Sequence, residues 1–317
     1  MAVFSWILLM LINSHHGHVV QPPEILIFFH IPKTGGSTMD AILRRRFPGP
    51  KHFNGHVGIS MSGLAAHSRE KIEAKYYALP EARRRAVSCV MGAHYPMGIH
   101  TMLDRPAKYF TLLRPPVERV ASHFFEDRTL PHRTCYDQIK DMTLDQYIDS
   151  GLGITPYDNQ VRLLSGCPEL DTPWDPDGNP ISALPVDSRH LELAKRNIEE
   201  HFIAAAPLES FNALLMMLRY IYGWGLTQVM YVKYNVGADR AFKTEPISAY
   251  ARGRLEETNR YDTQLYDWAK SRFAEQLKTL EPQLSRDIYR FELINKWAQR
   301  AHRAAPQLSK ILRGSGA

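Results

Sequence analysis

The sequence has few cysteines, and their arrangement suggests neither disulfide bonds nor a metal centre. Its three cysteines, Cys89, Cys135 and Cys167, are widely spaced and odd in number, and no CxxC pair occurs. This pattern predicts neither a disulfide framework nor a zinc site, and it favours buried thiols in a reducing compartment. We therefore expect a cytoplasmic protein without a metal.

Long hydrophobic runs are also missing. The N-terminal run from Ala2 to Ile12 is eleven residues long, whereas a membrane-spanning helix needs roughly 20. No Lys or Arg precedes this run, as a secretory signal would require. We expect residues 1–23 to form an N-terminal extension, with weak membrane association through residues 2–12 as the alternative.

The overall composition is that of a globular protein with a modest excess of positive charge. Of its 317 residues, 44% are hydrophobic and 23% are charged, which excludes global disorder. The formal net charge is +6, a sign that suits an anionic ligand but would equally suit a nucleic-acid or polysaccharide binder. Charge alone does not choose between these classes.

The order of the predicted elements indicates an α/β fold. A near-continuous apolar run at 24–30 reads as a strand buried on both faces, and helical spacing follows at 37–47. A second strand at 108–113 precedes a helix at 117–128, and a short strand is expected at 87–91. We predict a single domain with a mostly parallel central sheet flanked by helices.

The remainder of the chain is predicted to be less regular at first and then helical. Residues 129–190 are rich in turn formers and read as a loop-rich insertion, after which apolar stripes at 191–202 and 208–221 predict helices. We place the domain at 24–300 and a basic C-terminal tail at 301–317.

The turn after the first predicted strand carries the strongest chemical signal. A Gly-rich turn that opens a helix presents backbone N–H groups and the positive end of the helix dipole to an anion. The pattern GxxxxGK[ST] does not occur, because the lysine precedes both glycines, and GxGxxG is also absent. The sequence therefore predicts a P-loop-like phosphate-binding loop of another kind, formed by Lys33, Thr34, Gly35, Gly36, Ser37 and Thr38.

Two motifs resemble those of one enzyme family. HIPKTGGST at 30–38 is similar to the 5′-phosphosulfate loop of sulfotransferases related to the heparan sulfate and other carbohydrate O-sulfotransferases, which use 3′-phosphoadenosine 5′-phosphosulfate (PAPS). RPPVERVAS at 114–122 resembles their 3′-phosphate motif, with Pro115 in place of the usual Asp. The resemblance implies that Arg114 and Ser122 bind the 3′-phosphate. It extends from residue 24 to about 295 and includes DNQVRLLSG at 158–166.

A third segment supplies candidates for the general base that an acceptor hydroxyl needs. Residues 92–100, GAHYPMGIH, resemble a histidine-containing segment between the two cofactor motifs of this family, with Ala93 where Gly is usual. His94 is our candidate for the base, because histidine titrates near neutral pH. His100 is a second candidate, for which a structural role is the better interpretation, and His56 is a weaker one.

The sequence thus predicts a transferase that moves a sulfonate group from PAPS to an acceptor hydroxyl on a carbohydrate or glycoconjugate. The predicted catalytic residues are Lys33 and His94, and neither a metal nor a nucleic-acid partner is expected. A nucleotide-dependent kinase is an alternative, although no magnesium-ligand set is recognisable. A non-catalytic relative that binds glycans or polyanions is another.

Overall fold

The computed structural model describes residues 24–55, 65–93, 97–131, 136–150, 152, 157–167, 170, 184–232, 245–280 and 283–304. Within these residues, five strands form one sheet in the order β2-β3-β1-β4-β5, and every neighbouring pair is parallel. This sheet and its flanking helices confirm the predicted α/β class. The strands are β1 (Ile25–His30), β2 (His52–Asn54), β3 (Cys89–Ala93), β4 (Ala107–Leu113) and β5 (Phe202–Pro207).

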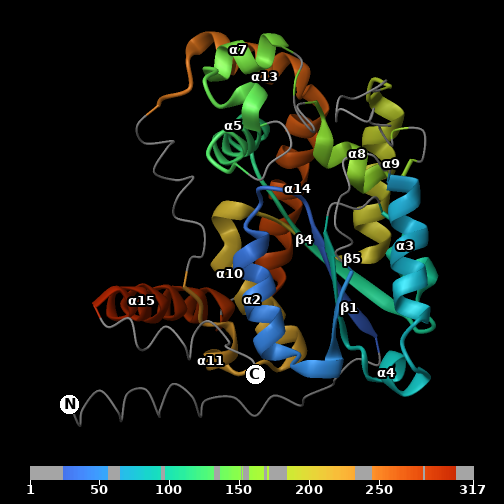
Figure 1. Ribbon diagram of the computed structural model, residues 1–317. Helices are drawn as coiled ribbons and strands as arrows, with labels where there is room; N and C mark the ends of the chain where they lie inside the picture. The colour runs from blue at the N-terminus through green and yellow to red at the C-terminus, as the bar shows by residue number, and fades with distance from the viewer. Residues whose placement is uncertain are drawn as a thin grey trace.

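Helices cover both faces of the sheet (Figure 1). Helices α2, α10 and α15 pack on one face, α3, α8 and α9 pack on the other, and α14 lies along β5 and contributes to both layers. The longer helices are α2 (Gly36–Arg46), α3 (Ala65–Tyr77), α5 (Pro116–Asp127), α9 (Ser188–His201), α10 (Phe211–Tyr222), α13 (Ala249–Thr258), α14 (Arg260–Thr279) and α15 (Gln283–Ala304). Shorter ones are α4 (Glu81–Ala86), α6 (Tyr136–Ile139), α7 (Leu144–Ser150), α8 (Asn159–Ser165), α11 (Leu226–Val229), η1 (Gly49–Lys51), η2 (Ile99–Met102) and η4 (Leu208–Ser210).

Strand β1 lies at the centre of the core. Its side chains alternate between the two faces, so that Ile25, Ile27 and Phe29 join one apolar cluster while Leu26 and Phe28 join the other. All five are essentially inaccessible to solvent. Two-sided burial explains why the sequence shows a continuous apolar run here instead of alternation.

One expectation for the second half of the chain needs correction. Phe202, which continues the apolar stripe of the preceding helix in the sequence, is instead the first residue of β5. The described residues of the segment at 129–190, expected to be loop-rich, include the short helices α6, α7 and α8. Residues 1–23 and 305–317, which include the apolar N-terminal run, lie outside the described residues.

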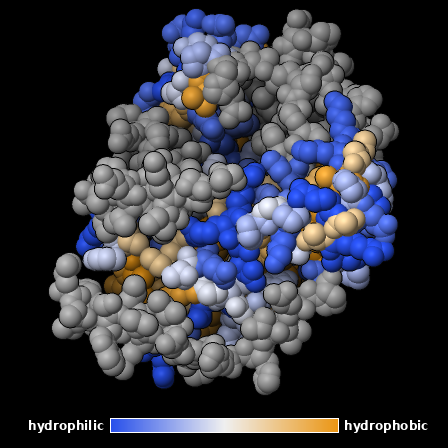
Figure 2. Space-filling model, turned by 60° about the horizontal axis from the view of Figure 1, so that its bottom comes forward, coloured by the Kyte–Doolittle hydropathy of each residue, from blue (hydrophilic) through white to orange (hydrophobic). Residues whose placement is uncertain are grey.

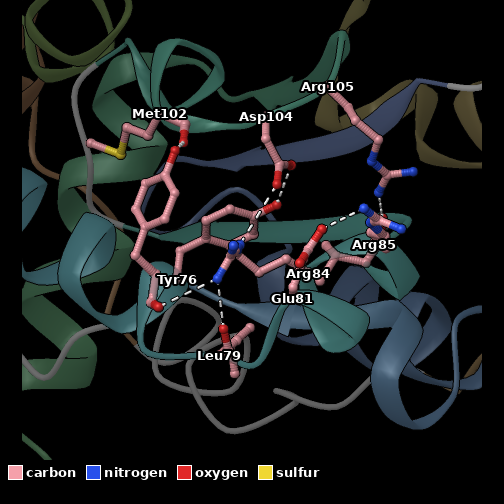
Figure 3. A network of polar contacts seen from close by, with 10 residues as sticks. Tyr76, Leu79, Glu81, Arg84, Arg85, Met102, Asp104 and Arg105 are labelled. Atoms are coloured by element: carbon pink, nitrogen blue, oxygen red, sulfur yellow. Dashed lines mark hydrogen bonds and ion pairs between the residues drawn. The ribbon is translucent and has the colours of Figure 1, made fainter.

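A polar network fastens α3 and α4 to the segment that leads into β4 (Figure 3). The hydroxyl of Tyr76 donates to Oδ1 of Asp104 at 2.9 Å, and Nη1 of Arg84 donates to the carbonyl oxygen of Leu79 at 2.8 Å. Arg84 also approaches Asp104, with 3.6 Å between Nε and Oδ2. These contacts join α3 and α4, which precede β3, to the segment before β4. They lie near the amino end of β4, away from the carboxyl ends of the strands.

The surface seen in Figure 2 is mainly hydrophilic over the described residues, with hydrophobic residues in small groups. Among the described helices, none combines the length and the apolar character that crossing a bilayer requires.

The topology brings the carboxyl ends of all five strands to one edge of the sheet. From β1 the chain proceeds to β2 and β3 on one side, and β4 then returns to pair with the other side of β1. In parallel α/β sheets, ligands bind outside the carboxyl ends of the strands where the chain changes direction in this way. Helix α5, which packs with α7 and α13 in a third apolar cluster, stands beyond this edge (Figure 1).

Candidate functional site

The loop between β1 and α2 is tightly wound around two glycines. Gly35 adopts the left-handed conformation at φ 87°, and a Cβ atom there would lie 2.9 Å from Cδ1 of Leu208. A side chain at Gly36 would collide with the imidazole ring of His30, which lies directly against it. The backbone therefore approaches its neighbours more closely than any other residue type allows at these two positions.

Thr34 stabilises the loop from within. Its side chain is fully buried, and its hydroxyl donates to the carbonyl oxygen of Ile31 at 2.8 Å. The hydroxyl predicted to contact the cofactor thus serves the turn, and the backbone N–H is the group that Thr34 can offer to an anion. Ser37 is exposed and Thr38 is half-buried at the start of the helix.

The amino end of α2 begins without a side-chain cap. The backbone N–H groups of its first turn are directed along the helix axis, away from the body of the helix. Its N-cap is Gly35, whose lack of a side chain leaves the cap without a side-chain hydrogen bond, and the first turn contains no acidic residue. No residue of this first turn therefore offsets the positive end of the helix dipole.

Lys33 and Arg114 are brought together at the ends of neighbouring strands. Lys33 adopts a left-handed backbone conformation at φ 69°, and Nη1 of Arg114 donates to its carbonyl oxygen at 3.2 Å. The ammonium group of Lys33 forms a partly buried ion pair with Glu126 of α5. Two cations from separate sequence motifs thus lie at one edge, beside the amino end of α2.

Helix α5 carries the rest of the second motif. Pro115 is its extended N-cap and Pro116 its first residue, a position that suits proline because that N–H has no helical partner. Pro115, which stands where the resembled sulfotransferases usually have Asp, is therefore compatible with this strand–helix junction. Ser122 is buried on this helix, and Glu126 follows it by one turn on the same side.

The histidine candidates are separated by the fold. Strand β3 ends at Ala93, opposite His30 of β1, so the chain leaves it at the edge that holds Lys33. His94 itself and His56 lie outside the described residues. His100 is near the opposite edge: its Nδ1 lies 3.0 Å from the hydroxyl of Tyr109, and its ring lies 4.4 Å from that of His201, which directly precedes β5.

Asp158 and Asp262 form a buried acidic pair close to the candidate site. Asp262 is completely buried and Asp158 nearly so, with the guanidinium of the fully buried Arg119 nearby. Burial and the charge of Asp262 raise the pKa of Asp158 to about 7. Burial also raises the pKa of Asp262, against the influence of Arg119. The charges of Arg119 and Arg162 favour the ionised carboxylates, but burial in an environment that disfavours charge outweighs them.

Sequence reasoning missed two residues of this arrangement. Glu126 contacts Lys33, and the side-chain amide of Gln160 bonds to both peptide groups of Arg114. Helical periodicity places Glu126 on the side of Ser122, but nothing local signals its partner. Gln160 lies within DNQVRLLSG, a segment recognised only as a resemblance.

The comparisons with family models and with curated proteins found no significant match. In the part of the chain that the structure describes, no group of three or more His, Cys, Asp or Glu side chains is placed to hold a metal ion.

Proposed function

We propose that this protein is a sulfotransferase that moves a sulfonate group from PAPS to an acceptor hydroxyl. The observation that carries the proposal is the meeting of Lys33 and Arg114 at the carboxyl ends of adjacent strands, linked by a 3.2 Å hydrogen bond. PAPS bears phosphates at both its 5′ and 3′ positions. A substrate with two separate anionic groups suits two separate cationic motifs.

The proposed phosphosulfate site is the β1–α2 loop. Its backbone N–H groups, the amino end of α2 and the ammonium of Lys33 would hold the 5′-phosphosulfate, in the manner of a P-loop-like site. The compactness of the loop at Gly35 and Gly36 supports this assignment, because close approach of the backbone is what such a site requires. Arg114 and Ser122 would bind the 3′-phosphate.

The reaction is an in-line displacement at sulfur. The acceptor oxygen forms a new bond to sulfur while the bond from sulfur to the bridging oxygen of the 5′-phosphate breaks. The acceptor proton passes to the neutral imidazole of His94, our proposed base, and adenosine 3′,5′-bisphosphate (PAP) leaves. Negative charge grows on the bridging oxygen, where Lys33 stabilises it, so that no metal is needed.

The ion pair with Glu126 sets a condition on this mechanism. In the structure the Lys33 ammonium is directed toward Glu126. Binding of the phosphosulfate must therefore draw Lys33 at least partly away from that carboxylate. Because both groups are only partly buried, solvent can take over part of the interaction and the exchange is feasible.

The acceptor class follows from the resemblance alone, which favours a sugar hydroxyl of a glycan or glycoconjugate. The decisive experiment is transfer of radiolabel from PAPS to a panel of oligosaccharides, lipids, phenols and tyrosyl peptides. We expect labelling of an oligosaccharide, with loss of label for Lys33→Ala. Lys278→Ala, which removes an exposed lysine of α14, is the matched control and should retain activity.

Three results would contradict the proposal in different ways. Phosphate transfer from ATP with magnesium would favour a kinase. Tight PAP binding without labelling of any acceptor would favour a non-catalytic relative. Labelling that survives Lys33→Ala would remove Lys33 from the reaction.

A further inference from the structure

Gln160 holds the backbone of Arg114 with both ends of its side-chain amide. Its Oε1 accepts the N–H of Arg114 at 3.1 Å, and its Nε2 donates to the carbonyl oxygen of the same residue at 3.0 Å. Gln160 is fully buried. Arg114 follows the last residue of β4, so the amide takes the place that a neighbouring strand would occupy if the sheet continued.

Gln160 is itself fixed by the buried acidic pair. The carboxylate of Asp262 accepts the N–H of Gln160 at 3.1 Å and that of Val161 at 2.8 Å. In return, Oδ1 of Asp158 accepts the N–H of Asp262 at 2.8 Å. Helices α8 and α14 therefore cap each other at their amino ends, and this arrangement anchors the glutamine at the end of β4.

These hydrogen bonds fix the backbone of Arg114 in one position. The side chain of Arg114 is only half-buried, and its guanidinium also bonds to the loop that carries Lys33. Bidentate recognition of phosphate needs the planar guanidinium held in a narrow range of orientations. A small rotation of the Arg114 peptide would move the end of this long side chain far from that geometry.

We propose that Gln160 is a positioning residue that determines the preference for a nucleotide with a 3′-phosphate. This inference rests on the proposed function, because it assigns Arg114 to that phosphate. The inference also gives a role to the DNQVRLLSG segment, which takes no direct part in the proposed reaction. Through Gln160, this segment fixes the position of the Arg114 backbone.

The test compares PAP with adenosine 5′-phosphate, which lacks only the 3′-phosphate. Binding of both to the full-length protein is measured by calorimetry for the wild type and for Gln160→Met, which keeps a similar volume without the amide. We expect the wild type to prefer PAP, and Gln160→Met to lose about tenfold of that preference, while affinity for adenosine 5′-phosphate changes by no more than about threefold.

A matched control acts on the other end of the same helix. Asn197 donates from Nδ2 to the carbonyl oxygens of Leu164 and Ser165, at 2.8 and 3.0 Å. Asn197→Ala should lower the melting temperature without changing the ratio of the two affinities. If Gln160→Met fails to fold, Asp262→Asn, which weakens the hold on the Gln160 backbone, should reduce the ratio in the same direction by a smaller factor.

The possible outcomes distinguish a failure of the role proposed for Gln160 from a failure of the proposed sulfotransferase function. Equal weakening of both nucleotides by the Gln160 and Asp262 variants would give Gln160 a purely structural role and overturn the inference. A wild type without preference for PAP would refute the proposed function, and the inference with it. A drop in the ratio that is specific to these variants would support both.

Discussion

The packing of Gly36 against His30 makes a quantitative prediction about the candidate phosphate loop. A Cβ atom at position 36 would overlap the imidazole ring. That ring is stacked on Phe28, with centroids 5.6 Å apart and planes inclined by 19°, so it has an aromatic neighbour on one side. Gly36→Ala must therefore displace either the ring or the amino end of α2.

The expected cost is that of overpacking, about 1–3 kcal/mol. In a chain of 317 residues, that corresponds to a fall in melting temperature of roughly 1.5–5 °C. The matched control is Gly253→Ala in α13, where an added Cβ meets no atom within 4 Å. This exposed helical position should gain about 0.5–1 kcal/mol from the same substitution.

A double-mutant cycle identifies the colliding group. His30→Ala removes the ring, so Gly36→Ala should cost much less in that background than in the wild type. Thermal unfolding without PAP measures the stability of each variant. The shift in melting temperature on adding PAP measures whether the loop still binds the nucleotide. A Gly36→Ala variant as stable as the wild type, or a double variant whose effects simply add, would refute the packing that we describe.

Three further predictions concern the charged and titrating groups. Arg114→Ala should weaken PAP binding by about 2–5 kcal/mol, and calorimetry showing unchanged affinity would remove it from the site. His94→Ala should lower turnover by a factor of about 10²–10⁴ and leave PAP affinity within a few-fold, whereas near-normal turnover would require another base. Because burial and Asp262 raise the pKa of Asp158 to about 7, the folded state takes up a proton there that the unfolded state does not. The resulting stability is full below about pH 4 and lost as pH rises through 7. As the pH rises from about 4 to about 7, Asp158→Asn should therefore gain stability relative to the wild type in urea unfolding, and parallel pH profiles would contradict this.

The elements that sequence reasoning located are those with a strong local signal. The sequence predicts the apolar run of β1, the Gly-rich turn and the start of α2 to within a residue or two, because two-sided burial and a strand–helix turn restrict residue choice locally. It places Phe202 in a helix because β5 follows α9 without a breaker, so the aromatic ring continues the apolar stripe in phase. Strand β2, only three residues long, carries no periodicity at all.

The partners within the site are set by the tertiary fold and leave no local trace. Glu126 is 93 residues from Lys33, and Gln160 is 46 residues from Arg114. Their contacts exist because α5 and α8 are packed at the carboxyl edge of the sheet, which no periodicity in either helix reveals. The sequence motifs predict which residues would bind an anion, but only the fold shows what holds those residues in place.

The most direct test of the central claim is the effect of nucleotides on the melting temperature of the whole protein. A ligand that binds only the folded state raises it by mass action. PAP should give a clear upward shift that Arg114→Ala reduces, and ATP with magnesium should give a far smaller one. A shift with ATP and magnesium that equals or exceeds the shift with PAP would contradict the sulfotransferase assignment.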